Sequence, residues 1–181
     1  ENPDKSGISS LTASMWNEDT ENYTAEEFSN ELEMIGSSVR VSGGGDDITV
    51  YVHTLKKNLD RTLELMQERM FSPKFNQDDF DRLKKRQLEG IANSDTQPTA
   101  IANQVYNKLL YGEGHFSSIP GSGTTETVST LTLDDVKKFY KDSFSPSMAN
   151  LVVVGDIDEK EIRNKLGFLD KLPKKQMTMS K

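Results

Sequence analysis

The sequence VRVSGGGDDITVYV, residues 39–52, decides the fold, because apolar and polar residues alternate on both sides of a glycine-rich turn. Alternation with a period of two places the valines on one face of a β-hairpin. The opposite face carries Thr49, Tyr51 and His53. We therefore expect two antiparallel strands joined at Gly43–Asp46, with one face buried.

Around this hairpin the apolar residues recur at intervals of three and four, which is typical of amphipathic helices. Side chains suited to capping precede several of these patterns, and a proline suits the first turn of another. The expected helices cover residues 8–16, about 58–70 and about 159–166, and four more begin at Thr24, Asn76, Pro98 and Thr132. Gly112–Thr124 is expected to be a loop.

Two further expectations concern the core and the sheet. In the helix that begins at Pro98, we expect Ile101, Val105 and Leu109 to be buried. The apolar run Leu151–Val154 is expected to form another strand. Together these patterns predict an α+β fold, in which an antiparallel or mixed β-sheet is covered on one face by helices. We expect one domain over residues 1–173 and a linker or tail over residues 174–181.

The composition excludes several classes of function. Hydrophobic residues make up 34% of the chain and charged residues 28%, as in a globular domain, and the longest apolar run is strand-sized, so no membrane span is expected. A net charge of −7 argues against a nucleic-acid partner. The absence of cysteine excludes disulfides, thiolate zinc sites and a cysteine nucleophile. It leaves cytoplasm, bacterial periplasm and organelle matrix all open as compartments. Because the chain begins without Met, we expect a piece of a longer polypeptide.

A series of short segments follows one another in a recognisable order. They are Ser6–Leu11, Thr24–Glu27, Leu32–Ser37, Asn58–Asp60, Phe71–Phe75, Leu109–Gly112 with His115, Gly123–Val128, Leu131–Tyr140, Ser145-Pro146 and Leu151–Asp156. In this order and spacing they resemble one domain of the pitrilysin/insulinase family of zinc peptidases, which includes the mitochondrial processing peptidase. The resemblance covers nearly the whole chain. It also implies that two further strands precede the segment matching Glu1–Gly7 in family domains, so one sheet edge would be uncovered here.

The resemblance implies that the zinc site is missing. Catalytic domains of the family carry an H-x-x-E-H motif on the first helix, where two His ligands share one helical face and the Glu is the base. A Glu from a later helix is the third ligand. Aligned with the family, these positions are Ser10, Ala13, Ser14 and Gly90. Since none has an imidazole or a carboxylate, the resemblance implies a non-catalytic domain with no metal, no cofactor and no catalytic residue of its own.

The resemblance also implies a function and a partner. In the family, two similar domains face each other around a chamber, and only one holds zinc. This chain would then close the chamber and help to bind an extended peptide substrate for a separate zinc-bearing catalytic domain, in the same polypeptide or in another chain. No activity is expected from the chain alone. An Arg and a Tyr that often line the inner wall in the family fall near Tyr51 and Asn58, so that pair is not clearly retained.

Two alternatives remain open. The first is a purely structural scaffold without an active partner, as in the core subunits of the respiratory bc1 complex. The second is a binding module for a small ligand, which lacks support because the sequence has no glycine-rich phosphate loop and no basic cluster.

Other candidate sites are weak in this sequence. His53 and His115 have no second histidine three or four residues away, which favours a surface or loop-ordering role over zinc binding. Asp46-Asp47 fits a hairpin turn rather than a calcium loop, and Gly121–Gly123 fits a flexible loop rather than a nucleophile elbow. Asp134-Asp135 begins a helix, where carboxylates favour the positive end of the helix dipole.

Overall fold

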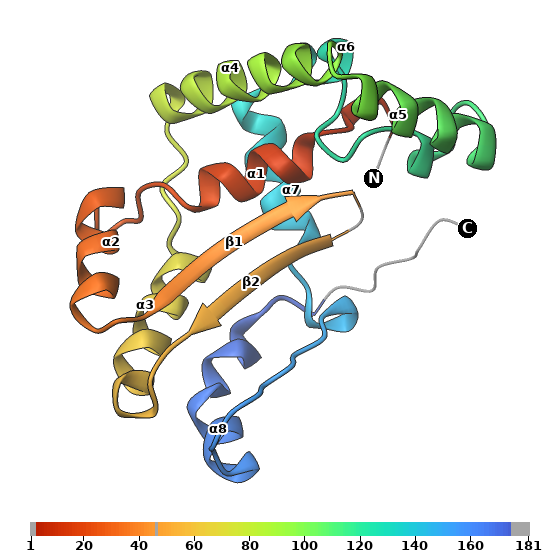
Figure 1. Cartoon of the computed structure of the whole chain (residues 1–181). Helices are drawn as coiled ribbons and strands as arrows, with labels where there is room; N and C mark the ends of the chain where they lie inside the picture. The colour runs from red at the N-terminus through yellow and green to blue at the C-terminus, as the bar shows by residue number, and fades with distance from the viewer. Residues whose placement is uncertain (1–2, 46, 175–181) are drawn as a thin grey trace.

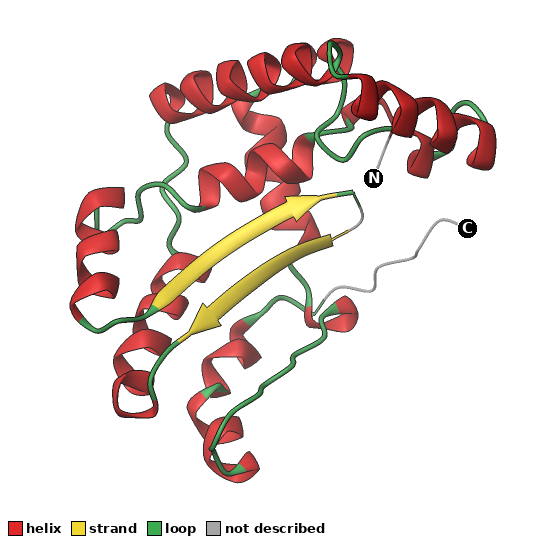
Figure 2. Ribbon diagram, viewed as in Figure 1, coloured by secondary structure: helices red, strands yellow, loops and turns green. Residues whose placement is uncertain are grey.

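The computed structural model describes residues 3–45 and 47–174. Asp46 of the predicted turn and nearly all of the predicted tail, residues 175–181, lie outside this part. Figures 1 and 2 show helices arranged around one β-hairpin. The elements are α1 (Ile8–Trp16), α2 (Ala25–Met34), β1 (Ser38–Gly44), β2 (Asp47–His53), α3 (Leu59–Phe71), α4 (Gln77–Ser94), α5 (Pro98–Tyr111), α6 (Thr125–Thr130), α7 (Leu133–Ser143) and α8 (Glu159–Lys165), with 3-10 turns η1 (Pro3–Lys5), η2 (Lys56–Asn58), η3 (Phe116–Ser118), η4 (Pro146–Met148) and η5 (Gly167–Lys171).

The expected helix starts are confirmed by their caps. Thr24 accepts a hydrogen bond from the backbone N–H of Glu27, whose carboxylate accepts one in return from the N–H of Thr24, so the two form a capping box. Asn76 caps α4 and Pro98 occupies the first turn of α5. The short helix α6 was not predicted, because its capping box uses a threonine three residues after Thr124 instead of the usual Glu or Gln.

The expected hairpin forms, but Gly43 and Gly44, which were expected in the turn, belong to β1 and pair with Ile48 and Asp47. Val39 pairs with Val52 and Val41 with Val50. The two β1 valines are buried on a single face, where Val39 packs with residues of α3 and Val41 with residues of α1. Tyr51, which is 61% exposed, lies on the other face. The structure therefore confirms a helix-rich α+β fold whose antiparallel sheet is covered on one face.

The helix α1 lies very close to β1. A Cβ added to Gly43 would lie 2.6 Å from the carbonyl oxygen of Ser9 and 2.9 Å from the Cβ of Ala13. Asn17 fixes this contact, because its Nδ2 donates to the carbonyl oxygen of Val41 at 2.6 Å and its Oδ1 accepts from the N–H of Val41 at 2.9 Å. The Asn17 side chain, directly after α1, thus bonds both backbone polar groups of Val41 in β1.

A buried arginine reinforces the same region. Arg69 of α3 is 5% exposed, and its Nη1 donates to Oδ1 of Asn17 at 2.9 Å. Its guanidinium lies over the Phe28 ring, with 3.9 Å between Cζ and the ring centroid. Burial lowers the pKa of Arg69 to about 10. No pattern in the sequence marks this residue, beyond its place beside Met70 on the buried side of α3.

Two apolar clusters form most of the core. The first joins α1, α4, α6 and α7, and the second joins α2, β1, α3 and α8. The first cluster contains Ile8, Leu11, Met15, Phe80, Leu83, Ile91, Val128, Leu131 and Val136. The second contains Phe28, Leu32, Val39, Leu63, Leu65, Met66, Met70, Ile162 and Leu166. The assignment of Met66 and Met70 to the core is therefore confirmed.

The expected strand at Leu151–Val154 is wrong. These residues form no regular secondary structure, and their exposed fractions run from 45% at Val153 to 92% at Val154. A continuous apolar run is typical of a strand with neighbours on both sides. Among the described residues the sheet consists of β1 and β2, so this segment has no strand to pair with.

The expected burial of one face of α5 is also wrong. Ile101, Val105 and Leu109 are 44%, 50% and 82% exposed. The helix continues from the end of α4 beyond the hairpin tip and lies against η3 (Figure 1). Periodicity identified the apolar face correctly, but it cannot say which surface covers that face. None of the described helices combines the length and the apolar character that a membrane-spanning helix needs.

Candidate functional site

The positions aligned with the family's zinc ligands lie on two helices that pack together. Ser10, Ala13 and Ser14 belong to α1 and Gly90 belongs to α4, and both helices contribute to the first core cluster. Gln87 of α4 joins the helices further, since its Nε2 donates to the carbonyl oxygen of Gly7 at 3.0 Å. The scaffold of a two-helix site is therefore present.

The side chains at these positions do not suit a metal. Ser10 and Ser14 are half-buried, one helical turn apart, and offer neutral hydroxyls. Ala13 is 2% exposed and packs against Trp16 and Val41. Gly90 is exposed, and a Cβ added there would meet no atom within 4 Å. Zinc in proteins is bound by imidazole, thiolate and carboxylate groups, so this set does not fit the ion.

The rest of the described chain does not provide a metal-binding cluster either. Over residues 3–45 and 47–174, no three His, Asp or Glu side chains gather in a way that could hold a metal ion. The correspondence of Ser10, Ala13, Ser14 and Gly90 with the family's ligands rests on the alignment and stays a prediction.

The two expected wall residues differ in their freedom to contact a ligand. Tyr51 projects from the uncovered face of β2. Asn58 is half-buried at the start of α3, where its Nδ2 donates to the carbonyl oxygen of Ile35 at 2.6 Å. The amide of Asn58 therefore joins α3 to the end of α2, and of the two only Tyr51 is free to contact a peptide.

The histidines stand apart from the α1–α4 pair. His53 is exposed at the end of β2. His115 caps η3, because its Nδ1 accepts a hydrogen bond from the N–H of Ser117 at 3.1 Å. Its ring also stacks on Tyr111, with 5.5 Å between ring centroids, and this contact joins α5 to the loop. His115 therefore has the loop-ordering role that the sequence favoured.

The Gly121–Gly123 segment is a packed joint rather than the flexible loop expected from the sequence. A Cβ added to Gly121 would lie 2.5 Å from the backbone nitrogen of Gly45 at the hairpin tip. The carbonyl oxygen of Ser122 accepts a hydrogen bond from Nε2 of Gln87 at 2.7 Å. Close backbone approach explains the glycines, so no nucleophile elbow is needed to account for them.

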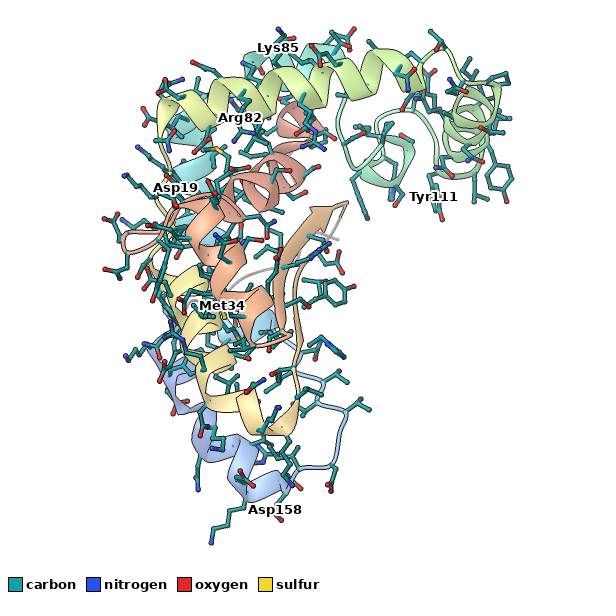
Figure 3. The ribbon with its side chains drawn as sticks, turned by 60° about the vertical axis from the view of Figure 1, so that its left-hand side comes forward. Asp19, Met34, Arg82, Lys85, Tyr111 and Asp158 are labelled. Carbon is teal, nitrogen blue, oxygen red and sulfur yellow. The ribbon has the colours of Figure 1, made fainter. Side chains whose placement is uncertain are left out.

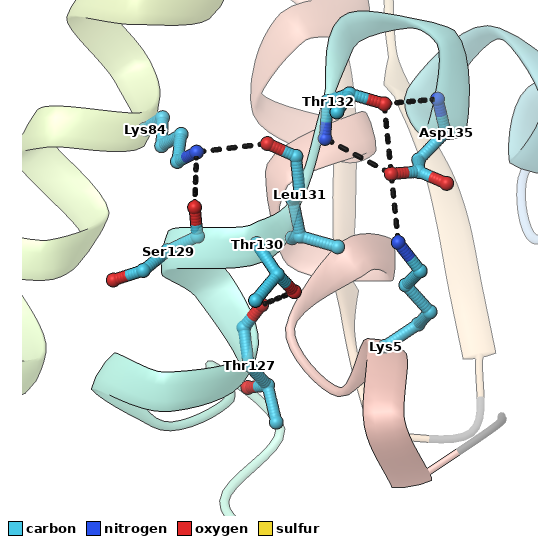
Figure 4. A network of polar contacts seen from close by, with 8 residues as sticks. All are labelled: Lys5, Lys84, Thr127, Ser129, Thr130, Leu131, Thr132 and Asp135. Atoms are coloured by element: carbon cyan, nitrogen blue, oxygen red, sulfur yellow. Dashed lines mark hydrogen bonds and ion pairs between the residues drawn. The ribbon is translucent and has the colours of Figure 1, made fainter.

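Asp135 acts as a capping residue. Its Oδ2 accepts hydrogen bonds from the N–H and the hydroxyl of Thr132, at 3.0 and 2.8 Å, and forms an ion pair with Nζ of Lys5 at 2.8 Å (Figure 4). The hydrogen bond from Lys5 holds the pKa of the Asp135 carboxyl below its ordinary value. Lys84 closes the neighbouring turn by donating to the carbonyl oxygens of Ser129 and Leu131. These contacts join the start of α7 to η1 and the end of α6 to α4.

The two best-formed hollows in the described part of the chain have volumes of about 160 and 20 Å³. Pockets for small organic ligands usually measure roughly 300–1,000 Å³. The geometry therefore gives no support to the small-ligand module left open by the sequence.

Comparisons with known proteins agree with the fold. The model of the insulinase family (peptidase family M16) matches residues 1–119, and that of the peptidase M16 inactive domain matches residues 130–179. The chain is 29% identical to "Zinc protease PqqE" of Helicobacter pylori over 87% of its own length and 36% of the relative's length. It is 26% identical to "Non-peptidase homolog YmxG" of the same organism, over 90% of this chain and 38% of the relative.

A solved structure agrees as well. The crystal structure of a protease from Helicobacter pylori matches with a TM-score of 0.84 and 25% identity, over 97% of this chain and 43% of that one. The chain thus spans between 36% and 43% of the length of these relatives. The family match extends over most of the sequence, and the H-x-x-E-H motif is absent from it. The chain belongs to the insulinase family, peptidase family M16, and is a non-catalytic domain of that family.

Proposed function

We propose that this chain is the non-catalytic half of a zinc metallopeptidase, and that it closes the chamber and helps to bind extended peptides for a separate zinc-bearing domain. The zinc ion and the catalytic base would belong to that partner, which would carry H-x-x-E-H. This chain would contribute a wall that orders the peptide and excludes water from the reaction.

The observation that carries the proposal is the chemistry of the α1–α4 pair. Two packed helices hold the positions that the alignment predicts for a metal site, yet these positions carry two hydroxyls, one buried methyl group and one glycine. Such a set cannot polarise a peptide carbonyl or activate water. The names of the relatives support a division of labour, since one is called a zinc protease and the other a non-peptidase homologue.

The uncovered face of the hairpin supports the peptide-binding part. Tyr51 is exposed there, and an exposed tyrosine offers a flat apolar ring and a hydroxyl to an extended chain. Among the described residues, the helices pack on the opposite face through Val39 and Val41, and we propose that the face with Tyr51 forms the inner wall.

A mixing experiment tests the proposal. The zinc-bearing M16 domain of the same organism, identified by H-x-x-E-H, is assayed on an extended fluorogenic peptide with and without this chain. We expect the chain alone to be inactive and the mixture to show at least a tenfold higher kcat/KM than the zinc-bearing domain alone, equivalent to about 1.4 kcal/mol. Replacing Tyr51→Ser should reduce this activation without changing the unfolding midpoint of the chain, because the side chain is exposed.

The alternative function makes the opposite prediction in the same assay. A purely structural scaffold would leave the kcat/KM of the zinc-bearing domain unchanged on mixing, and that result would overturn the proposal.

A further inference from the structure

The helix α5 is anomalous, because its fourteen residues include many apolar ones and none is buried. An apolar helix in a globular protein is ordinarily covered by other elements. Its exposed large apolar residues are Ile101, Val105, Tyr106, Leu109, Leu110 and Tyr111. In a domain with two well-formed core clusters, this accumulation calls for a partner surface.

The orientation of α5 strengthens the argument. Its half-buried residues are Ala100, Gln104 and Asn107, which recur at intervals of four and three and therefore share one side. Ile101, Val105 and Leu109 also recur every four residues, and they lie on a different side of the helix that is exposed. The helix thus directs its more polar side toward the molecule and its apolar side toward solvent, the reverse of an ordinary surface helix.

The chemistry of this outward side resembles a protein interface. Lys108 is the one charged residue among the fourteen of α5, in a chain that is 28% charged. Two tyrosines accompany the aliphatic residues. Depletion of charge together with aromatic enrichment is typical of the centre of protein–protein interfaces. A helix of this length presents a strip about 21 Å long, enough for an anchor cluster.

We propose that the outward face of α5, formed by Ile101, Val105, Tyr106, Leu109 and Leu110, is a docking surface for the zinc-bearing domain. This inference rests on the proposed function and names the part of the chain that contacts the partner. The helix begins four residues after α4, which carries Gly90, so it lies directly beyond the helix pair of the altered site. The relatives extend well beyond the matched region, which leaves length for a second domain of similar size.

Other occupants fit less well. A second copy of this chain would bring two molecules of net charge −7 together, and an anionic membrane surface would be repelled in the same way. The expected contact is therefore heterologous and mainly apolar.

A pair of matched variants tests the assignment. Leu109→Glu places a charge on the docking face, where the native residue is 82% exposed, and Met34→Glu places one at the end of α2, where the native residue is 83% exposed. Figure 3 shows Met34 well away from Tyr111, which marks the end of α5. The dissociation constant for the zinc-bearing domain is measured for both variants and for the unaltered chain, together with urea unfolding midpoints. We expect at least tenfold weaker binding for Leu109→Glu and a change below twofold for Met34→Glu, with both midpoints unchanged.

Each other outcome would overturn the assignment. Equal affinities for both variants would remove α5 from the interface while leaving the proposed function intact. A lower unfolding midpoint for Leu109→Glu alone would mean that this face packs within the chain itself. Self-association of the unaltered chain that Leu109→Glu abolishes, with unchanged affinity for the zinc-bearing domain, would make a second copy the occupant. Failure of the unaltered chain to bind the zinc-bearing domain at all would overturn the proposed function as well.

Discussion

Ala13 and Gly90, which the alignment predicts at positions of the family's zinc site, differ in the space around them. Ala13 is enclosed by Trp16, Val41 and the close approach of Gly43, so its methyl group has become part of the core. Gly90 on α4 is open to solvent, and a Cβ added there would meet no atom within 4 Å. Restoring a carboxylate should therefore have very different consequences at the two positions.

We expect Ala13→Glu to lower the free energy of unfolding by about 3 kcal/mol, because it buries a carboxylate without a partner in a closely packed space. The control Gly90→Glu introduces the same side chain and should change stability by less than about 1 kcal/mol, since the position is exposed and glycine disfavours helix. Urea denaturation measures both. An Ala13→Glu variant as stable as the unaltered chain would show that the space around residue 13 is not closely packed.

Asp135 provides a pH-dependent test. Its pKa is lower in the folded chain than in the unfolded chain, chiefly through the hydrogen bond from Lys5. The stabilisation is therefore complete above the ordinary pKa of 3.8 and is lost as the pH falls through the folded-state value.

We expect Asp135→Asn to cost about 1 kcal/mol near neutral pH, because it weakens the cap of α7 and removes the ion pair. The difference from the unaltered chain should shrink as the pH falls below 3.8 and through the lowered folded-state pKa of Asp135, because the carboxyl then becomes neutral like the amide. Unfolding at a series of pH values measures this, and Asp134→Asn, the same charge change at the exposed neighbour, is the control. A difference that persists in acid would contradict the assigned role.

At the scale of elements, α1 packs closely on β1 at Gly43. Gly43→Ala would direct a methyl group at the backbone of Ser9, which cannot move as a side chain can. We expect a loss of about 2 kcal/mol in unfolding free energy. Gly44→Ala is the control, because nothing lies within 4 Å of a Cβ at that position. Similar unfolding midpoints for the two variants would contradict the close packing of α1 on β1.

The success of sequence reasoning also differs from element to element. The hairpin and most helices were predictable because period-two alternation and caps such as Thr24, Asn76 and Thr132 are local signals. Leu151–Val154 was not, because strand formation depends on a neighbouring strand that local sequence does not reveal. The exposure of α5 was missed for a similar reason, since periodicity identifies an apolar face but not the surface that covers it.

At the candidate site, too, some features were predictable from the sequence and others were not. The alignment could assign Ser10, Ala13, Ser14 and Gly90 and state which chemical groups they lack. It could not show that Ala13 is sealed against β1 or that the amide of Asn58 is already engaged by Ile35, because both depend on packing between distant segments. The sequence therefore predicted which chemical groups stand at these positions, but it did not predict how tightly each side chain is packed or which hydrogen bonds it already makes.

At the scale of the whole molecule, the described residues combine two packed helices, a sheet face that no described helix covers and an exposed apolar helix. The helix pair carries the positions predicted for the metal site, and we propose the sheet face as the wall for an extended peptide and the apolar helix as the surface for a partner domain. These three features are consistent with one half of a two-domain peptidase in which the other half performs the chemistry.

The zinc content of the purified chain tests this account most directly. The 181-residue chain is equilibrated with a small excess of zinc, separated from free ion by gel filtration, and measured by atomic spectroscopy. The account predicts less than about one zinc per ten chains, because Ser10, Ala13, Ser14 and Gly90 provide no imidazole or carboxylate ligand. One tightly held zinc per chain, lost on substitution at the α1–α4 pair, would contradict it.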